Sequence, residues 1–336
     1  MKEFIEKCLS GENLTMDEAA RALDLIMTGQ ASDVQIAGLL VALRAKGESI
    51  DELVGFARTM RKHAVKVNVD DEDAIDVCGT GGDSLGTFNI STMAAFVIAG
   101  AGVTVAKHGN KSVSSKSGSA DLLTALGVNI QCPPAKVEEC INTVGVGFLF
   151  APMFHPAMKF AAKTRSELGI RTIFNLLGPI TNPAGVKKQL IGTFQPAVAT
   201  KLAGTVEKLS TDMTCVVHSK DGLDEVTLSG ETSVHEVEKL RGARHYSVDP
   251  TYFGLPSRPL SSLRGGSPQE NASIAVDVLN KNPGPARDVV IANAAFGLYV
   301  AGKARDLHEG SRMAARSIDS GSALDRLNRM IAFTGR

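Results

Sequence analysis

A short apolar strand and a glycine-rich turn come together in Asp76-Val77-Cys78-Gly79-Thr80-Gly81-Gly82-Asp83, with Ile75 beginning the strand. Three glycines within four residues let the backbone adopt positive φ and approach a ligand closely. Next come Thr87-Phe88-Asn89-Ile90-Ser91-Thr92 and an apolar helix, for which Ser91 or Thr92 is the predicted N-cap. The first-turn N–H groups of that helix favour an anion, so the segment predicts a phosphate-binding turn. The alternative is a strand-to-helix turn without a ligand.

Composition limits the class of protein. The 336 residues are 43% hydrophobic and 21% charged, which is typical of a soluble globular chain that can form one large and one small domain. Lys plus Arg and Asp plus Glu both number 36, so no global field attracts nucleic acid or anionic lipid. The N-terminus, over residues 1–11, has no apolar core of signal-peptide length, and no window approaches 18 uninterrupted apolar residues, as a membrane span would need. Five cysteines without a C-x-x-C pair indicate reduced thiols, and we expect a cytoplasmic protein.

The first 68 residues show helical periodicity, with apolar residues at Ala19, Ala22, Leu23 and Ile26. Thr15 to Glu18 predicts a capping box, and further helices are expected to begin near Ser32 and Ser49. We therefore predict a small helical domain over residues 1–68, which helices from about 153–182 are candidates to join.

Residues 69–336 alternate short apolar runs with helical segments, which predicts a second, larger α/β domain. The expected strands are Ile75–Val77, Val103–Ala106, Val146–Phe150 and Thr214–His218. Such alternation favours a mostly parallel central sheet flanked by helices, with ligands at the carboxyl ends of the strands. The Pro/Gly-rich stretch from Gly254 to Pro285 is predicted to be a surface connection with a short helix over 268–278.

A second polar loop follows the second expected strand, over Lys107–Asp121. It contains three lysines, five serines and one histidine, so its hydroxyls, amides and ammonium groups could bind phosphate oxygens. The alternative is a solvated polar loop that caps a helix at Ser119. Because two such loops follow successive strands, they point to one ligand with separated phosphates.

Carboxylates at two places could hold a metal ion. Asp83 lies at the edge of the glycine turn, where it could bind a sugar hydroxyl, close the loop by a hydrogen bond or bind a metal. Asp224 and Glu225 are adjacent, after a strand and a turn, and Mg²⁺ usually bridges one or two carboxylates to substrate phosphates. The alternative for this pair is ordinary solvated side chains.

Arg165 follows the segment Phe148–Lys159 and is predicted to lie on a helix. A planar, permanently charged guanidinium suits a substrate carboxylate, whereas an ordinary helix-surface arginine is the alternative. His155, between apolar residues and Pro156, is expected to be a packed, hydrogen-bonded histidine rather than a base. Cys78 is expected to be a buried apolar filler rather than a nucleophile.

Taken in order, these segments resemble the anthranilate phosphoribosyltransferase family, which is related to the pyrimidine nucleoside phosphorylases. The likeness covers almost the entire chain. The motifs that carry it are Gln35-Ile36-Ala37, Leu43–Gly47, Gly79–Asp83, Asn89–Thr92, Lys107–Asp121, His155-Pro156-Ala157-Met158, Gly169–Pro179 and Asp221–Glu225.

The resemblance implies transfer of the 5-phosphoribosyl group from 5-phosphoribosyl 1-diphosphate (PRPP) to the amino group of anthranilate, a step of tryptophan biosynthesis that uses Mg²⁺. It implies contacts to PRPP from Gly79, Gly82, Asp83, Thr87, Asn89, Ser91, Thr92, Lys107 and Ser119. The metal ligands it implies are Ser91, Asp224 and Glu225. Anthranilate would be bound or its path lined by Gly79, His108, Asn110, His155, Arg165 and Gly178. The resemblance also implies a homodimer through the helical domain, and it assigns no acid or base.

Three sites depart from the family pattern: Ser84 replaces a common glycine, Phe154 a common histidine, and Lys163–Ser166 a common Pro-Val-Arg-Arg run. Phe154 and Thr164 bear on details of the anthranilate channel. Two alternatives stay open at this point, a pyrimidine nucleoside phosphorylase and a non-catalytic nucleic-acid-binding relative. The Arg165 segment and the Asp224–Glu225 pair favour the transferase over the phosphorylase, and the neutral net charge argues against nucleic-acid binding.

Overall fold

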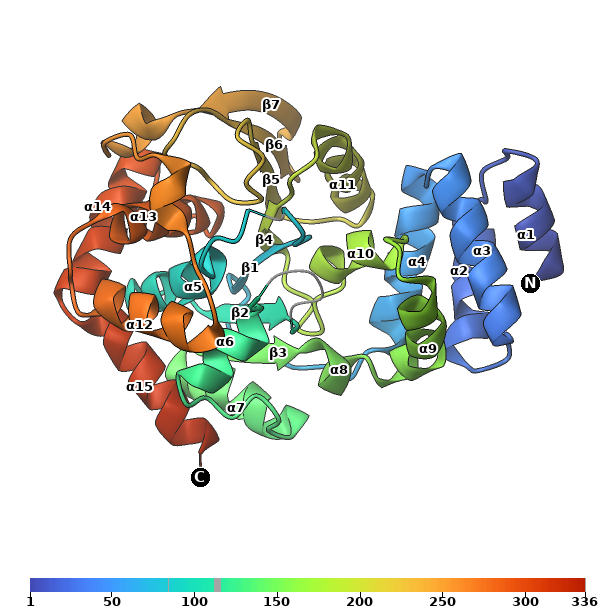
Figure 1. Cartoon of the computed structure of the whole chain (residues 1–336), viewed down its shortest axis with the longest axis horizontal. Helices are drawn as coiled ribbons and strands as arrows, with labels where there is room; N and C mark the ends of the chain where they lie inside the picture. Colours follow the sequence, from blue (N-terminus) through green and yellow to red (C-terminus); the bar gives the residue numbers. More distant parts are fainter. Residues whose placement is uncertain (84, 112–115, 336) are drawn as a thin grey trace.

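The computed structural model describes residues 1–83, 85–111 and 116–335. Its opening segment is a helical unit of four helices: α1 (Lys2–Leu9), α2 (Met16–Met27), α3 (Asp33–Lys46) and α4 (Ile50–His63). Capping boxes at Thr15, Ser32 and Ser49 start the last three helices, which confirms the predicted helix starts. The helical unit lies to one side of a larger α/β part in Figure 1.

The α/β part is built on one seven-stranded sheet with the strand order β3-β2-β1-β4-β5-β6-β7. The strands are β1 (Ile75–Gly79), β2 (Val105–Gly109), β3 (Val146–Phe150), β4 (Lys188–Gly192), β5 (Met213–Ser219), β6 (Thr232–Glu238) and β7 (Gly242–Val248). The first five strands are parallel, and β6 and β7 are added antiparallel. The prediction of a helical opening followed by a mostly parallel sheet is therefore confirmed.

Alternate residues of the central strands face two different apolar cores, as the two-residue period of a strand requires. Val77, Leu190 and Val217 pack in the core formed with α5 (Ile90–Gly100) and α13 (Pro285–Val300). Cys78, Ile191 and Val216 face the other way, into the core formed with α11 (Pro196–Lys208) and the helical unit. Burial on both faces explains why these strands read as short apolar runs rather than as an alternation.

The remaining helices surround the sheet (Figure 1). They are α6 (Ser119–Ala125), α7 (Pro134–Val144), α12 (Pro268–Leu279), α14 (Leu307–Asp319) and α15 (Ser322–Thr334), with short 3₁₀ turns at Pro250–Phe253 and Leu260–Leu263. None of the helices within the described ranges is both long and apolar enough to cross a membrane.

Between β3 and β4 the chain leaves the sheet. It forms α8 (Ala151–Phe154), a 3₁₀ turn at Pro156–Met158, α9 (Lys159–Leu168), α10 (Phe174–Leu177) and a 3₁₀ turn at Gly178–Ile180. The α9 helix contacts α2 and α3, and α10 contacts α4. Residues 151–180 therefore run along the helical unit and return to the sheet, which places Arg165 on a helix between the two parts of the chain.

Several expectations about elements were wrong. Lys107 and His108 belong to β2 itself, which runs to Gly109, and not to the loop that follows it. The strands β4, β6 and β7 were not predicted, because their polar residues hide the apolar pattern. The stretch from Gly254 to Pro285 is not simply a surface connection, since Leu263 and Gly265 bond to the chain around the glycine turn.

Candidate active site

The carboxyl ends of the parallel strands meet at one edge of the sheet, where the strand order reverses between β1 and β4. The glycine turn begins there. Thr80 N donates to Gly192 O over 2.9 Å, and a Cβ built on Gly79 would lie 3.2 Å from the same oxygen and 3.3 Å from Asp224 Oδ2. A side chain at Gly79 would therefore be tightly packed between β4 and the Asp224 loop, while Gly81 and Gly82 adopt φ of +65° and +83°.

An arginine from the segment after α9 reaches this turn. Arg171 Nη2 donates to Gly82 O over 2.7 Å, and the guanidinium lies 4.4 Å from the centre of the Phe194 ring. A Cβ built on Gly82 would lie 1.7 Å from Arg171 Nη2, so a side chain at position 82 would displace the end of this arginine, and the φ of +83° strains any other residue there. Arg171 was absent from the predicted site residues, because its partner is 89 positions away in the sequence.

The helix after the turn begins two or three residues earlier than expected. The N-cap of α5 is Asn89, without a side-chain cap bond, so the prediction of Ser91 or Thr92 as the cap is wrong. Asn89 bonds instead to Ser117: Asn89 Nδ2 donates to Ser117 O over 3.0 Å, and Ser117 Oγ donates to Asn89 Oδ1 over 3.3 Å. Ser91 and Thr92 lie in the first helical turn, and the side chain of Thr92 is buried.

Three carboxylates, those of Asp83, Asp224 and Glu225, lie together beside the start of α5. Ser91 N donates to Glu225 Oε1 over 3.1 Å. Burial and the charges of Glu225 and Asp83 raise the pKa of Asp224 well above its usual range. Burial also raises the pKa of Glu225 to about 7, which the ammonium group of Lys107 opposes. Because burial disfavours the ionised forms of these acids, a bound cation would stabilise them.

Lys107 lies in the middle of β2, and its side chain is buried beside the start of α5. Its ammonium group donates to Val77 O and lies 3.5 Å from Ser91 Oγ. Ser119 lies near the end of this strand, since a Cβ built on Gly109 would be 2.8 Å from Ser119 Oγ. The helix α6 begins at Ser119 with Gly118 as its N-cap, and Asp121 accepts from Gly118 N, so Ser119 does not cap it.

Two neutral histidines lie next to each other on the side of the helical unit. The rings of His108 and His155 are 5.2 Å apart. Burial, with the neighbouring His155, lowers the pKa of His108 to about 3, and burial lowers the pKa of His155 to about 4. Gly178 O is 3.0 Å from His108 Nδ1 and can only accept, so Nδ1 carries the proton. His108 Nε2 is therefore a buried acceptor without a partner among the described residues.

Arg165 is half-buried on α9, with its guanidinium 5.0 Å from the centre of the Phe174 ring. Its neighbours Lys163 and Thr164 both bond to Asp33 at the start of α3, over 3.3 and 3.4 Å. Phe154 is buried in a small apolar cluster. Two of the departures from the family pattern, at Thr164 and Phe154, are therefore used in packing the chain, and the third, Ser84, lies outside the described residues.

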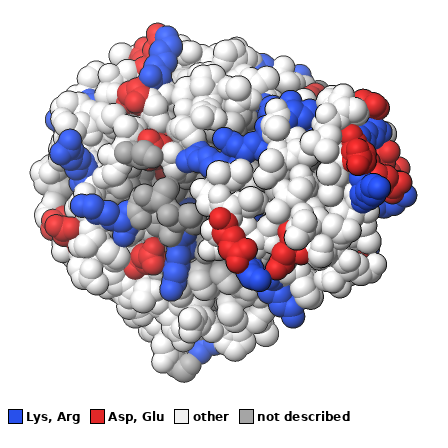
Figure 2. Space-filling view, turned by 45° about the vertical axis from the view of Figure 1, so that its right-hand side comes forward, with Lys and Arg blue, Asp and Glu red and all other residues white. Residues whose placement is uncertain are grey.

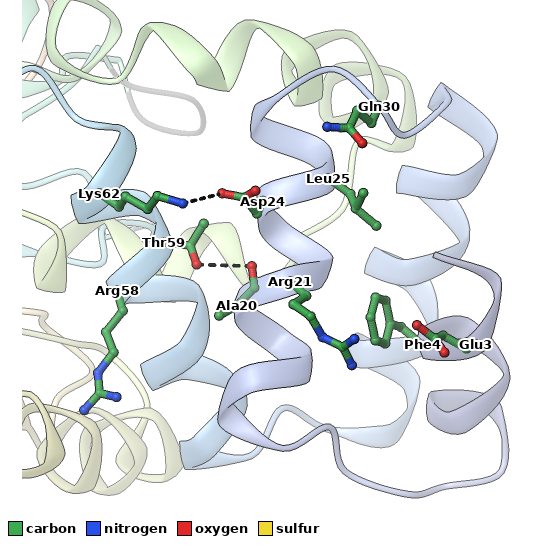
Figure 3. A pocket seen from close by; sticks show the side chains of 10 residues that line it. All are labelled: Glu3, Phe4, Ala20, Arg21, Asp24, Leu25, Gln30, Arg58, Thr59 and Lys62. Carbon is green, nitrogen blue, oxygen red and sulfur yellow. Dashed lines mark hydrogen bonds and ion pairs between the residues drawn. The ribbon is translucent and has the colours of Figure 1, made fainter.

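A separate hollow of about 610 Å³ opens between α1, α2 and α4 (Figure 3). It contains charged side chains, but Arg21 lies over the Phe4 ring and Lys62 pairs with Asp24. None of the predicted site residues lines it. The chemistry therefore gathers at the strand ends, while the wider surface mixes both signs of charge, as Figure 2 shows for one face.

Comparison with known proteins agrees with this geometry. Residues 2–64 match the "Glycosyl transferase family, helical bundle domain", and residues 71–324 match the "Glycosyl transferase family, a/b domain". The anthranilate phosphoribosyltransferase of Pelotomaculum thermopropionicum is 50% identical over 335 residues, covering 100% of this chain and 97% of that protein. The chain belongs to the anthranilate phosphoribosyltransferase family. The Moorella thermoacetica member is 51% identical over 334 residues, covering 99% of this chain and 98% of its own.

Solved structures of the family have the same fold. The anthranilate phosphoribosyltransferase of Thermus thermophilus superimposes with a TM-score of 0.93 at 45% identity, covering 99% of both chains. The enzyme of Saccharomyces cerevisiae in complex with PRPP and Mg superimposes with a TM-score of 0.91 at 30% identity, covering 99% of this chain and 97% of that one. Both chains are covered almost from end to end, so the likeness includes the helical unit and the sheet.

Proposed function

We propose that this chain transfers the 5-phosphoribosyl group from PRPP to the amino group of anthranilate and releases pyrophosphate, in tryptophan biosynthesis. One observation carries the proposal. A glycine turn, a buried lysine and two adjacent carboxylates whose pKa values are raised by burial meet at one sheet edge. The family membership and the PRPP and Mg bound to the yeast relative support it.

In this proposal PRPP lies across the ends of β1 and β2. The main chain of the glycine turn offers N–H groups to the phosphates, the positive end of the α5 dipole attracts them, and Lys107 offers a positive charge. The residues that we propose for PRPP are Gly79, Gly82, Asp83, Thr87, Asn89, Ser91, Thr92, Lys107 and Ser119. The glycine turn and the start of α5 thus provide both features that the ligand needs, close approach of the backbone and a site for an anion.

The metal site is proposed at Asp224, Glu225 and Ser91. Their fit to Mg²⁺ rests on geometry: two adjacent carboxylates lie beside the start of α5, where Ser91 N donates to Glu225 Oε1 over 3.1 Å. Burial raises the pKa of both acids, so a cation that stabilises their ionised forms fits there. The described residues contain no group of three or more His, Cys, Asp or Glu side chains that would hold a metal unaided. Substrate phosphates would therefore complete the shell, which is the usual way in which Mg²⁺ is bound. When bound, Mg²⁺ would neutralise the pyrophosphate as it leaves.

Anthranilate is proposed to bind between the sheet edge and α9. Arg165 would pair with its carboxylate, since a guanidinium forms two parallel bonds to such a group. The unprotonated His108 Nε2 could accept from the amino group, which fits a neutral imidazole. The residues that we propose for this substrate are Gly79, His108, Asn110, His155, Arg165 and Gly178.

The chain's own residues would act by positioning and by electrostatics. An aromatic amine is a competent nucleophile once it is desolvated, so we assign no general base. Lys107 and the helix start hold the leaving group, and Arg165 aligns the amine with the ribose C1 as positive charge develops there. The buried, dry surroundings of His108 and His155 strengthen these interactions.

We further propose a division into a helical domain over 1–68, which the helices of 153–182 join, and an α/β domain over 69–336. The packing of α9 on α2 and α3 supports it. A homodimer through the helical domain is proposed on the exposed apolar side chains of Val34, Val41 and Phe160, on α3 and α9. Sedimentation would test the dimer. The five cysteines form no disulfide, which supports a cytoplasmic location, since free thiols suit a reducing compartment.

The activity is tested by following the fluorescence of anthranilate with purified protein, with and without PRPP and Mg²⁺. Loss of fluorescence that requires both additions is the expected result. Persistent fluorescence with a folded protein would refute the proposal. In that case, phosphate-dependent cleavage of pyrimidine nucleosides and a salt-dependent DNA-binding titration would test the two alternatives.

A further inference from the structure

A buried asparagine far along the chain touches the proposed PRPP site. Asn271 lies in the first turn of α12 and is 2% exposed. Its Nδ2 donates to Asn89 Oδ1 over 3.1 Å, across 182 positions of sequence. Its Oδ1 accepts from Gly266 N over 2.8 Å. Asn271 therefore connects a residue proposed to bind PRPP with a segment outside the predicted site.

The outer partners in this series of hydrogen bonds, Gly266 N and Ser117 O, determine how the amide groups of Asn271 and Asn89 are oriented. Gly266 N can only donate, so the Asn271 atom that faces it is Oδ1 and its Nδ2 faces Asn89. Ser117 O can only accept, so the Asn89 atom that faces it is Nδ2. The Oδ1 of Asn89 thus receives Asn271, and one N–H of Asn89 Nδ2 remains without a partner among the described residues.

Backbone contacts hold the same segment against the glycine turn. Gly265 N donates to Gly86 O over 2.8 Å, Phe88 N donates to Leu263 O over 3.2 Å, and Thr87 forms an antiparallel bridge with Arg264. A Cβ built on Gly265 would lie 2.6 Å from Asn271 Oδ1 and 2.7 Å from Phe88 N. The stretch before α12 is therefore packed tightly enough to set the position of Asn89.

We infer that Asn271 is a positioning residue for PRPP: it orients the Asn89 amide so that one N–H of Nδ2 points to the diphosphate sugar. This inference rests on the proposed function. A buried amide that makes this donor and acceptor pair cannot be replaced by a carboxylate without turning a donor into an acceptor. Asn271→Asp should therefore turn Asn89 away, and the effect should fall on PRPP rather than on anthranilate.

The variants Asn271→Asp and Asn271→Ala test this, with Asn280→Asp as the matched control, because Asn280 is exposed at the other end of the same helix. Both Asn271 variants should raise the KM for PRPP by about tenfold, with the KM for anthranilate within about twofold. The same loss should appear in calorimetric titration with PRPP. If these variants do not fold, Asn271→Ser keeps a hydroxyl group at the position and should give the same selective loss, because a serine side chain is too short to reach both Asn89 Oδ1 and Gly266 N.

A double-mutant cycle with Asn89→Ala separates positioning from a structural role. If Asn271 acts through Asn89, then Asn271→Ala should cost little PRPP affinity once Asn89 is alanine. Full additivity, or unchanged PRPP affinity in a folded Asn271 variant, would overturn the inference. Failure of the wild-type protein to bind PRPP in the same titration would instead overturn the proposed function, and the inference with it.

Discussion

Glu225→Gln should stabilise the metal-free protein at alkaline pH while it removes Mg²⁺-dependent turnover. Burial raises the pKa of Glu225 from 4.5 to about 7. A pKa raised by about 2.5 corresponds to roughly 3 kcal/mol when the group is ionised. Because Glu225 keeps part of its surface in contact with solvent, we expect a gain of about 1–2 kcal/mol. The amide of glutamine still accepts from Ser91 N, so no hydrogen bond is lost.

The sign follows from proton binding. Between pH 4.5 and about 7 the folded protein holds a proton on Glu225 that the unfolded chain has released. The stability of the wild-type protein therefore falls as the pH rises through this window. The gain from Glu225→Gln should be complete above pH 7 and absent below about pH 4.5.

Urea unfolding in EDTA at pH 8 and pH 4.5 measures the difference in free energy of unfolding. Glu207→Gln, on the exposed face of α11, is the control and should change neither value. Added Mg²⁺ and pyrophosphate should stabilise the wild-type protein at pH 8 and leave Glu225→Gln unchanged. If the variant is less stable than the wild-type protein at pH 8, then the surroundings of Glu225 do not disfavour its ionised form.

Three further outcomes are expected. Arg165→Ala should weaken anthranilate binding by about 1.5–3 kcal/mol, the scale of a charged hydrogen bond, and an unchanged KM for anthranilate would exclude this role. Gly82→Ala should reduce PRPP affinity strongly, because its φ is +83° and its Cβ displaces the Arg171 guanidinium; Arg171→Ala in the same chain removes the collision but not the backbone strain and should not restore full affinity, and unchanged PRPP affinity of folded Gly82→Ala in calorimetry would contradict the geometry. His108 and His155, with pKa values lowered to about 3 and about 4, should make unfolding free energy fall by up to about 1.4 kcal/mol per pH unit each as the pH drops below about 6.5. His155→Gln should flatten that slope in acid unfolding curves, and an unchanged slope would show that His155 is protonated in the folded protein.

Local signals explain which parts of the fold could be predicted. The capping boxes at Thr15, Ser32 and Ser49 depend on residues three apart, so the sequence displays them directly. Strand β6 could not be recognised in this way. Its buried Glu236 looks like a break in an apolar pattern until Arg244 and Tyr246, from the next strand, are seen to pair with it.

The site residues likewise divide into those with a local sequence signal and those that depend on residues remote in sequence. The glycine turn was predictable because positive φ demands glycine, and the carboxylate pair because its members are adjacent. The cap of α5 was predicted wrongly because the side chain of Asn89 is committed to Ser117 and Asn271, which are remote in sequence. Arg171 was missed for the same reason.

The contact between Arg171 and Gly82 limits which substitutions these two positions can accept during evolution. The guanidinium fills the space that any side chain at position 82 would need. A mutation of Gly82 would therefore displace the arginine and also strain the backbone, whose φ is +83° at this position. Loss of the arginine would open the space but leave the strain in place and Gly82 O without its donor. Glycine is thus expected to persist at position 82, whereas position 171 can vary at the cost of one hydrogen bond.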